Sequence, residues 1–231
     1  MRTSDEYKRL AAETAVELIE SGMALGLGHG STVQFALEAL ARKLKNGTIT
    51  DITAVPCSIK TEGEMRGLGI PLGDLNRFTT IDLTIDGADE IDPQLNLIKG
   101  GGGALLREKI VAQSSQRYVI IVDESKLSPK LGTRHSLPLE LAPFGWQRQR
   151  DFLAELGGKA EWRIDANGNP ILSDQGNYLV DCDFGPISDL KSLSLQLEAR
   201  SGILEHGLFL ELASDVIVAG GDGVRHLKPK S

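Results

Sequence analysis

The sequence is poor in cysteine and aromatic residues and has no long hydrophobic run. Its 2 cysteines, Cys57 and Cys182, lie far apart and form no C-x-x-C pair, which argues against a disulfide framework and against a thiolate zinc site. No apolar stretch approaches the ~20 residues of a membrane-spanning helix, and the segment MRTSDEYKRL lacks the apolar core of a signal peptide. We therefore expect a cytoplasmic protein that does not engage a membrane.

The chain also lacks an excess of basic residues. Its 25 lysines and arginines are outnumbered by 32 aspartates and glutamates, giving a net charge of −7, and we see no basic stripe, so we expect no nucleic-acid partner. A small anionic substrate in a local basic pocket is compatible with this charge. The 231 residues, 41% hydrophobic and 25% charged, are typical of a globular protein with one large domain or two small ones.

The first half of the chain alternates strand-like and helix-like patterns. Thr3 and Glu6 form a capping box for a first helix. Buried strands are expected near 23–28, 52–57, 81–85 and 117–122, and helices near 31–47, 61–68 and 104–113. This alternation predicts an α/β fold with a Rossmann-like parallel sheet and helices on both faces.

The pattern changes after about residue 132. A helix is expected over 144–158, strands over 159–165, 170–174 and 178–184, and a further helix over 188–202. The stretch 215–224 returns to the buried-strand type and would rejoin the first sheet. We therefore expect an α/β catalytic domain from 1–132 and 206–231, with a small α+β (ferredoxin-like) domain inserted over 133–205.

The segment GLGHGST, 26–32, joins a strand to a helix. It is neither the dinucleotide fingerprint, because Ser31 stands at the third glycine position, nor a P-loop. Its glycines would still let backbone N–H groups at the helix N-terminus face a phosphate, with Ser31 and Thr32 adding hydroxyl donors. The alternative is an ordinary strand–helix turn with Ser31 as N-cap.

Carboxylates gather in TIDGADEID, 84–92, at the expected end of a strand. Ligands of parallel sheets bind at this end, and Asp86 would stand at the exit of the strand, where Gly87 allows the chain to turn. The alternative is a solvated acidic loop, with Glu90 and Asp92 exposed. The spacing does not match an EF-hand calcium loop.

The segment KGGGGALLREK, 99–109, places Lys99 beside four glycines that lead into a helix. The glycines offer a second concavity rich in N–H groups. Glu108 would point alone into a cleft, with Arg107 and Lys109 facing solvent or a partner subunit; the alternative is that Glu108 is a surface residue. After the next strand, Lys126 in VDESK either reaches a phosphate as a point charge or is a surface lysine.

These segments in this order resemble ribose-5-phosphate isomerase of the A type. The resemblance extends to PLELAPF (138–144), DQGNYLVD (174–181) and GGDGV (220–224). It implies interconversion of ribose 5-phosphate and ribulose 5-phosphate through an enediolate, with no metal and no organic cofactor, in a homodimer or homotetramer. Pentose phosphate metabolism and the Calvin cycle both need this step.

The resemblance also implies roles for individual residues. Glu108 would be the general base, with Asp86, Asp89 and Lys99 as further catalytic residues. The remaining substrate contacts would be the phosphate loop, the carboxylate loop, the glycine loop and one or two lysines: His29, Gly30, Ser31, Thr32, Gly87, Ala88, Gly100, Gly101, Gly102, Lys126 and Lys8. His29 stands where the family often has a small hydroxyl residue.

Other functions of related folds stay open at this point. An amino-sugar phosphate deaminase, a lactonase or a CoA-transferase-like protein would need site residues of its own. A non-catalytic sugar-phosphate sensor of a transcription regulator would need a DNA-binding module, for which we see no room before Met23.

Overall fold

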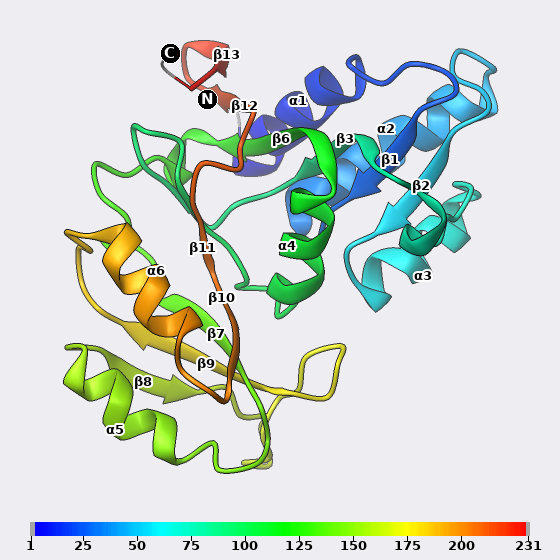
Figure 1. Ribbon diagram of the computed structural model, residues 1–231. Helices are drawn as coiled ribbons and strands as arrows, with labels where there is room; N and C mark the ends of the chain where they lie inside the picture. The colour runs from blue at the N-terminus through cyan, green and yellow to red at the C-terminus, as the bar shows by residue number, and fades with distance from the viewer. Residues whose placement is uncertain (1–2, 230–231) are drawn as a thin grey trace. The chain divides into compact units, whose positions relative to one another are not determined.

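A computed structural model describes residues 3–229 (Figure 1), and no helix within this range is both long and apolar enough to cross a membrane. The chain forms two compact units. The first comprises the residues up to Ala88, Arg107–Lys126 and the residues from Leu212 on, and the second comprises Asp89–Leu106 and Leu127–Glu211. The second unit therefore takes in more of the chain than the 133–205 expected from the sequence.

The first unit is built on a six-stranded sheet of order β13-β12-β6-β3-β1-β2. Its strands are β1 (Ala24–Leu27), β2 (Thr53–Pro56), β3 (Ile81–Asp86), β6 (Ser115–Asp123), β12 (Asp215–Gly220) and β13 (Gly223–Leu227). All neighbouring pairs are parallel except β12 and β13, which form an antiparallel hairpin. The expected α/β fold class is thereby confirmed, while the stretch 215–224 contains one strand and the start of a second.

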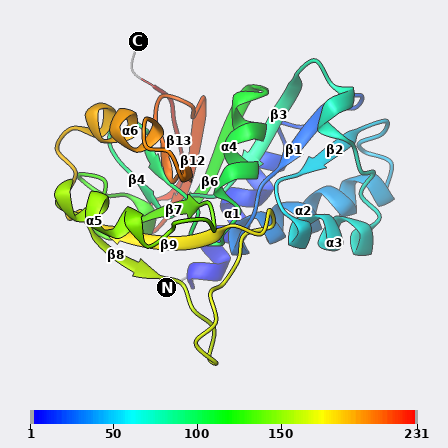
Figure 2. The same cartoon turned by 60° about the horizontal axis from the view of Figure 1, so that its bottom comes forward.

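Helices cover both faces of this sheet (Figures 1 and 2). They are α1 (Ser4–Val16), α2 (Ser31–Lys45), α3 (Ile59–Leu68) and α4 (Leu105–Gln113), with the short 3₁₀ helices η1 (Leu75–Arg77) and η2 (Glu124–Lys126). The capping box at the start of α1 is confirmed, because the Thr3 side chain and the Glu6 backbone bond each other as expected. Helices α1, α2 and α3 contribute to the core on one face, and α4 lies on the other.

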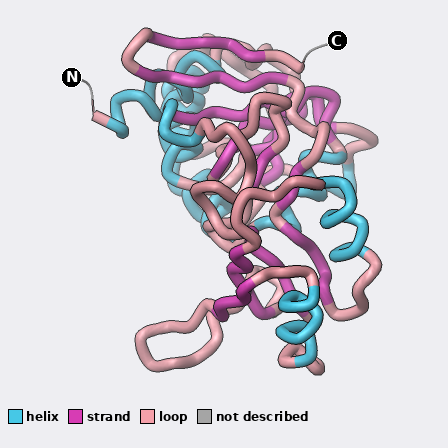
Figure 3. The backbone as a smooth tube through the Cα atoms, turned by 90° about the vertical axis from the view of Figure 1, so that its left-hand side faces the viewer, coloured by secondary structure: helices cyan, strands magenta, loops and turns pink. Residues whose placement is uncertain are grey.

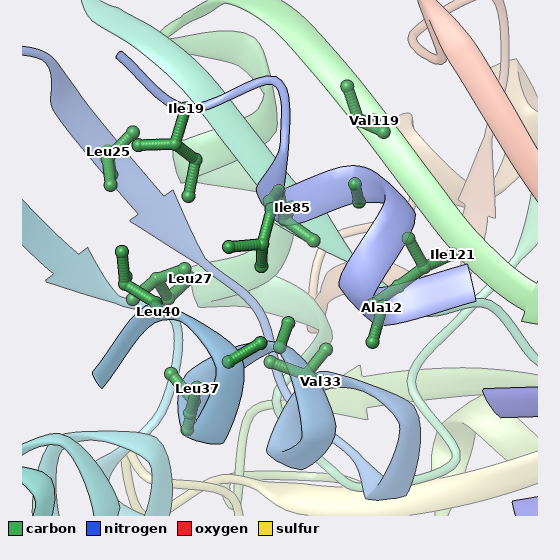
Figure 4. Close-up of a cluster of buried hydrophobic side chains, with 14 of the residues drawn as sticks. Ala12, Ile19, Leu25, Leu27, Val33, Leu37, Leu40, Ile85, Val119 and Ile121 are labelled. Atoms are coloured by element: carbon green, nitrogen blue, oxygen red, sulfur yellow. The ribbon is translucent and has the colours of Figure 1, made fainter. Parts of the chain in front are cut away.

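Alternation along the strands decides which side chains meet which helices. Leu27, Ile85 and Ile121 belong to the core with α1 and α2 (Figure 4). Their neighbours in sequence point to the opposite face, where an added Cβ at Gly26 would lie 2.6 Å from Val111 of α4. Asp86, one residue after Ile85, is therefore on the α4 side of the sheet.

The second unit contains two antiparallel sheets. The larger has the order β10-β7-β9-β8 and carries helices α5 (Arg148–Glu155) and α6 (Leu190–Glu198). Its strands are β7 (Leu137–Leu141), β8 (Lys159–Trp162), β9 (Tyr178–Asp183) and β10 (Ile203–His206). The chain order β-α-β-β-α-β with this strand order is the ferredoxin-like arrangement. Leu139, Val180 and Leu197 are among its buried core residues.

The smaller sheet joins β4 (Glu90–Ile91), β5 (Leu97–Ile98) and β11 (Leu208–Phe209) in the order β11-β5-β4. Leu208 pairs with Ile98, and Phe209 pairs with Leu97. This pairing explains why residues 89–106 belong to the second unit, since their strands complete a sheet with a segment more than 100 residues further along the chain.

One expected strand is wrong. Residues 170–174 form no strand but lie in the connection 163–177 between β8 and β9, a loop that Figures 2 and 3 show extending from the sheet. Only isolated bridges occur there, and Ile171 and Leu172 are 43% and 52% exposed. Apolar character alone does not make a strand when no sheet neighbour buries it. Helix α5 begins at Arg148 rather than near 144.

Candidate active site

The predicted phosphate loop and the first part of the carboxylate loop, up to Ala88, lie together in the first unit. Strands β6, β3 and β1 are adjacent and parallel, so their carboxyl ends reach one edge of the sheet. After β1 the chain continues to β2 on one side, and β3 lies on the other side of β1. Ligands of open α/β sheets bind at such a reversal of strand order. Residues 28–32 and Asp86 stand at this edge.

Asp86 holds the phosphate loop in place. Its Oδ1 accepts the backbone N–H groups of His29 at 3.2 Å and Gly87 at 2.7 Å. The loop can approach because residue 28 is glycine: an added Cβ at Gly28 would lie 1.9 Å from this same oxygen. The Asp86 side chain is completely buried, so in this structure the carboxylate organises the end of the strand.

The N-terminus of α2 follows this loop directly. Its N-cap is Gly30, with a φ of 121° that favours glycine, and no side chain caps the helix there. The alternative in which Ser31 is the N-cap is therefore wrong; Ser31 is the first helical residue and is exposed. The His29 ring is engaged at the start of α3, where Nδ1 lies 2.9 Å from Oγ of Ser58.

Tyr118 is a site residue that the sequence did not reveal. It lies on β6 and donates from its hydroxyl to Oδ2 of Asp86 at 2.9 Å. Burial raises the pKa of the Tyr118 phenol well above its usual value, and repulsion from the carboxylates of Asp86 and Glu108 adds to the rise. The tyrosine stands directly before the apolar run Val119–Val122, and its hydroxyl was the only local signal for this role.

Glu108 is buried on α4, with 3% of its surface exposed. The alternative in which Glu108 is a surface residue is therefore wrong. Its negative charge contributes to the raised pKa of the Tyr118 phenol, and α4 lies on the same face of the sheet as the Asp86 side chain. The neighbouring Lys109 was expected to face solvent or a partner subunit, but it is only 7% exposed, so this part of the helix is enclosed on more than one side.

The glycine loop and Asp89 meet in the second unit. Oδ2 of Asp89 accepts the backbone N–H of Gly101 at 2.8 Å, and an added Cβ at Gly101 would lie 2.9 Å from the other carboxylate oxygen. Gly100 and Gly103 adopt φ values of 104° and 79°, which favour glycine. A bond of 2.9 Å from the N–H of Gly103 to the carbonyl of Gly100 closes the turn. Gly102 is exposed.

Lys99 lies immediately before this loop and is 2% exposed. Its backbone N–H donates to the carbonyl of Gly207 at 2.9 Å, and its ammonium group lies 5.5 Å from the ring centre of Phe209. A cation over an aromatic ring is attracted by the negative face of the ring. Lys99 is thus a buried positive charge next to a rigid turn.

The other acids of the carboxylate loop have structural roles. Glu90 is fully buried rather than exposed, and its carboxylate accepts the backbone N–H groups of four consecutive residues, 132–135, at 3.0–3.3 Å. Asp92 is 5% exposed and accepts from the backbones of Gln94 and Asn96. The alternative interpretation placed both acids in solvent, and it is wrong. Buried backbone N–H groups need hydrogen-bond acceptors, and these two carboxylates supply them.

The remaining candidate residues are all half-buried. Lys8 on α1 pairs with Asp5 at 3.2 Å. Lys126 ends η2, directly after β6, and is half-buried. Thr32, in the first turn of α2, and Gly87 and Ala88, directly after β3, are half-buried as well. Residues 3–229 contain no group of three or more His, Cys, Asp or Glu side chains that could hold a metal ion.

The structure therefore assembles two groups of the predicted residues. In the first unit, Asp86 bonds both the backbone of the phosphate loop at His29 and the hydroxyl of Tyr118, and the charge of Glu108 adds to the raised pKa of Tyr118. In the second unit, Asp89, Lys99 and residues 100–103 form one rigid turn. The chain passes from one group to the other at residues 88–89 and again at residues 106–107. Helix α4, which carries Glu108, begins two residues after Gly103.

Comparison with known proteins identifies relatives over nearly the whole chain. The family model described as ribose 5-phosphate isomerase A (phosphoriboisomerase A) matches residues 53–223. The chain is 53% identical over 225 residues to ribose-5-phosphate isomerase A of Chloroflexus aurantiacus, covering 97% of this chain and 94% of that protein. It is 51% identical over 228 residues to the protein of the same name from Desulfatibacillum aliphaticivorans, covering 99% of both.

A solved structure is similar as well. The structure of a D-ribose-5-phosphate isomerase in complex with phospho-erythronic acid matches with a TM-score of 0.96 and 37% identity. The match covers 98% of this chain and 100% of that one.

Proposed function

The chain belongs to the ribose 5-phosphate isomerase A family, and we propose how its residues carry out the aldose–ketose isomerisation. It interconverts ribose 5-phosphate and ribulose 5-phosphate. The reaction moves a proton between C2 and C1 of the open-chain sugar. It therefore needs one base near both carbons, stabilisation of the enediolate oxygens, and an anchor for the phosphate.

Glu108 is the proposed general base. The observation that carries this assignment is a carboxylate buried on helix α4, whose charge adds to the raised pKa of Tyr118, the residue that bonds Asp86. A helix holds the carboxylate rigidly, so one group can remove a proton from one carbon and return it to the other. General acid–base catalysis of this kind contributes ~10²–10⁴-fold.

Lys99 and the glycine loop are proposed to stabilise the negative charge of the enediolate. A buried ammonium group and preoriented backbone N–H groups act strongly because little water competes with them. Asp89 accepts the N–H of Gly101 and so helps to hold the loop in the orientation that presents the N–H of Gly102. Asp86 and Asp89 are proposed to exchange protons with the sugar hydroxyls and to assist ring opening.

The phosphate is proposed to bind at the N-terminus of α2. Gly30, Ser31 and Thr32 present backbone N–H groups and hydroxyls there, and the helix dipole favours an anion. Lys126 and Lys8 are proposed as further positive charges, and His29, Gly87, Ala88, Gly100 and Gly102 as backbone contacts. Binding energy at the phosphate then positions C1 and C2 at Glu108.

The experiment that tests the base is Glu108→Gln in the full chain. We expect turnover of ribose 5-phosphate to fall by about 10²–10⁴-fold. Binding of phospho-erythronic acid, the ligand of the solved relative, should stay within a few-fold by calorimetry. Glu155→Gln, at an exposed position on α5, is the matched control. A Glu108→Gln enzyme with the wild-type rate would overturn the assignment.

Alternative activities are not favoured, since the relatives are named as ribose-5-phosphate isomerases. Parallel assays with ribose 5-phosphate and glucosamine 6-phosphate separate isomerase from deaminase activity. We further propose a cytoplasmic homodimer or homotetramer that serves pentose phosphate metabolism or the Calvin cycle. The two buried cysteines form no disulfide, which is compatible with a reducing compartment, and light scattering gives the oligomer mass.

A further inference from the structure

We propose that Arg163 is a positioning residue that sets the orientation of the glycine loop, residues 100–103. This inference rests on the proposed function of that loop. Arg163 follows β8 in the second unit, 62 residues beyond Gly101 in the chain. Its Nη1 donates to the carbonyl of Gly101 and its Nη2 to the carbonyl of Gly100, both at 3.1 Å.

Asp181 on β9 binds a second edge of the guanidinium group, formed by Nε and Nη2. Nε of Arg163 donates to Oδ2 of Asp181 at 2.8 Å, and Nη2 donates to Oδ1 at 2.6 Å. The Arg163 side chain is only 14% exposed, and Asp181 is 37% exposed. This two-point pairing holds the plane of the guanidinium, which a lysine cannot reproduce because its ammonium group is a single point charge.

The contacts determine which way the loop presents its amides. In a trans peptide the C=O and N–H groups point to opposite sides, and no cis peptide occurs among the described residues. Because Arg163 attracts the carbonyls of Gly100 and Gly101, the N–H groups of Gly101 and Gly102 point away from it. The N–H of Gly101 reaches Asp89 at 2.8 Å. The peptide between Gly100 and Gly101 is therefore held by a charge at each end.

Consecutive glycines need such an external constraint. Glycine loses more conformational freedom on folding than any other residue, and four in a row would sample many orientations. Arg163 and Asp89 restrict them to the one orientation in which the Gly102 amide is available on the side opposite Arg163. Lys99, directly before the loop, is fixed with it through its backbone bond to Gly207.

The first test compares Arg163→Ala and Arg163→Lys with the wild-type full chain. We expect kcat for ribose 5-phosphate to fall about 10- to 100-fold in Arg163→Ala, because small displacements of catalytic donors have effects of this size, with a smaller change in KM. The kcat of Arg163→Lys should lie between those of the wild type and Arg163→Ala. If Arg163→Ala does not fold, Arg163→Lys carries the test, and a wild-type kcat in either folded variant overturns the proposal.

Chemical rescue distinguishes positioning from a loss of stability. A pocket of about 570 Å³ lined by Arg163, Asp181 and Gly101 opens beside the loop, so a small cation can enter when the side chain is removed. Millimolar guanidinium should raise the kcat of Arg163→Ala several-fold, whereas urea at the same concentration should not. Absence of rescue together with a kcat loss that follows the loss of stability would overturn the proposal.

The matched control is Arg117→Ala. Arg117 forms an ion pair of 2.6 Å with Asp215 in the first unit, so its removal breaks a similar pair without touching the glycine loop. Its kcat should stay near the wild-type value, and guanidinium should have no effect. An equal loss of kcat in Arg117→Ala would show that any broken Arg–Asp pair acts through stability and would contradict the assignment.

Hydrogen exchange tests the inference without reference to activity. The amides of residues 100–103 should exchange faster in Arg163→Ala than in the wild type, and at the wild-type rate in Arg117→Ala. Unchanged exchange would overturn the role of Arg163 even if Glu108→Gln behaves as proposed. Conversely, faster exchange together with full activity of Glu108→Gln would leave Arg163 as the anchor of the loop and remove the proposed base.

Discussion

The hydroxyl of Tyr118 on β6 donates a hydrogen bond of 2.9 Å to Oδ2 of Asp86 at the end of the neighbouring strand β3. Both residues are buried, with 1% and 0% of their surface exposed. Because Oδ1 of the same carboxylate accepts the backbone N–H groups of His29 and Gly87, the phenol fixes one half of a carboxylate whose other half holds the phosphate loop.

Removing this hydroxyl should weaken both the fold and substrate binding. We expect Tyr118→Phe to lower the free energy of unfolding by about 1.5–3 kcal/mol, the range for a hydrogen bond to a charged group, and to raise KM for ribose 5-phosphate. Urea unfolding and steady-state kinetics measure the two effects. Tyr7→Phe on α1, at a half-buried tyrosine, is the control. An unfolding midpoint equal to that of the wild type would contradict a stabilising role of the bond.

The same phenol should make the protein sensitive to alkali. Burial, with repulsion from Asp86 and Glu108, holds the pKa of Tyr118 well above its usual value of 10.0. Above about pH 10 the unfolded chain therefore binds fewer protons than the folded chain, and the free energy of unfolding falls as pH rises. Below that pH the stabilisation is complete.

Unfolding of Tyr118→Phe measured between about pH 9 and 11.5 should show a shallower decline than that of the wild type. The stability of Tyr118→Phe should still fall somewhat as pH rises. Burial raises the pKa of the Cys182 thiol from 9.0 to about 12, and this shift also lowers the free energy of unfolding at high pH. Parallel curves for the two proteins would rule out Tyr118 as the source.

A methyl group at residue 28 should disturb the site from the backbone side. We expect Gly28→Ala to destabilise the fold by about 1–3 kcal/mol, as overpacking does, and to lower kcat/KM at least 10-fold, because the new Cβ would lie 1.9 Å from Oδ1 of Asp86. Gly63→Ala is the control, since nothing lies within 4 Å of its added Cβ. This helical substitution should be neutral or stabilising. Equal behaviour of the two variants would refute the close contact.

Glu90 should matter for stability rather than for chemistry. In the wild type the Glu90 carboxylate accepts the N–H groups of residues 132–135. Glu90→Gln replaces one of its oxygens with an NH₂ group, which donates and cannot accept them. We expect a loss of at least about 1.5–3 kcal/mol in thermal or urea unfolding, with kcat of the folded fraction nearly unchanged. Glu155→Gln provides the reference. A stable Glu90→Gln protein with low kcat would instead point to a role in catalysis.

Isomerase activity should be insensitive to chelation. The proposed proton transfer uses Glu108 and the charges of Lys99 and the glycine loop, and the family resemblance implies no metal. Dialysis against EDTA should therefore leave kcat unchanged. Loss of activity followed by recovery with one divalent cation, and not with others, would require a different mechanism.

The local pattern of residues predicted much of the first unit and most of the candidate site. The alternation of apolar strands and amphipathic helices depends on neighbours within a few residues. It therefore located β1, β2, β3, β6 and the helices between them. The same locality identified Gly30 and Asp86 as residues at strand ends, where parallel sheets bind ligands.

Local sequence patterns could not predict the contacts between segments that are distant in the chain. Strand β7 was missed because LPLEL carries a proline and alternates weakly, and the strand 170–174 was wrongly expected because its apolar residues find no sheet neighbour. Tyr118 meets Asp86 across 32 residues, and Glu90 meets residues 132–135 across more than 40. These partners are set by strand order and register.

The sequence by itself determined which residue types stand at the ends of which strands, because helix and strand periods and glycine turns are local properties. Only the tertiary structure decided which of these acids anchor backbone and which is enclosed beside a helix. That decision follows from burial: a carboxylate removed from water takes whichever N–H and O–H donors the fold brings to it, and those donors come from segments far away in the chain.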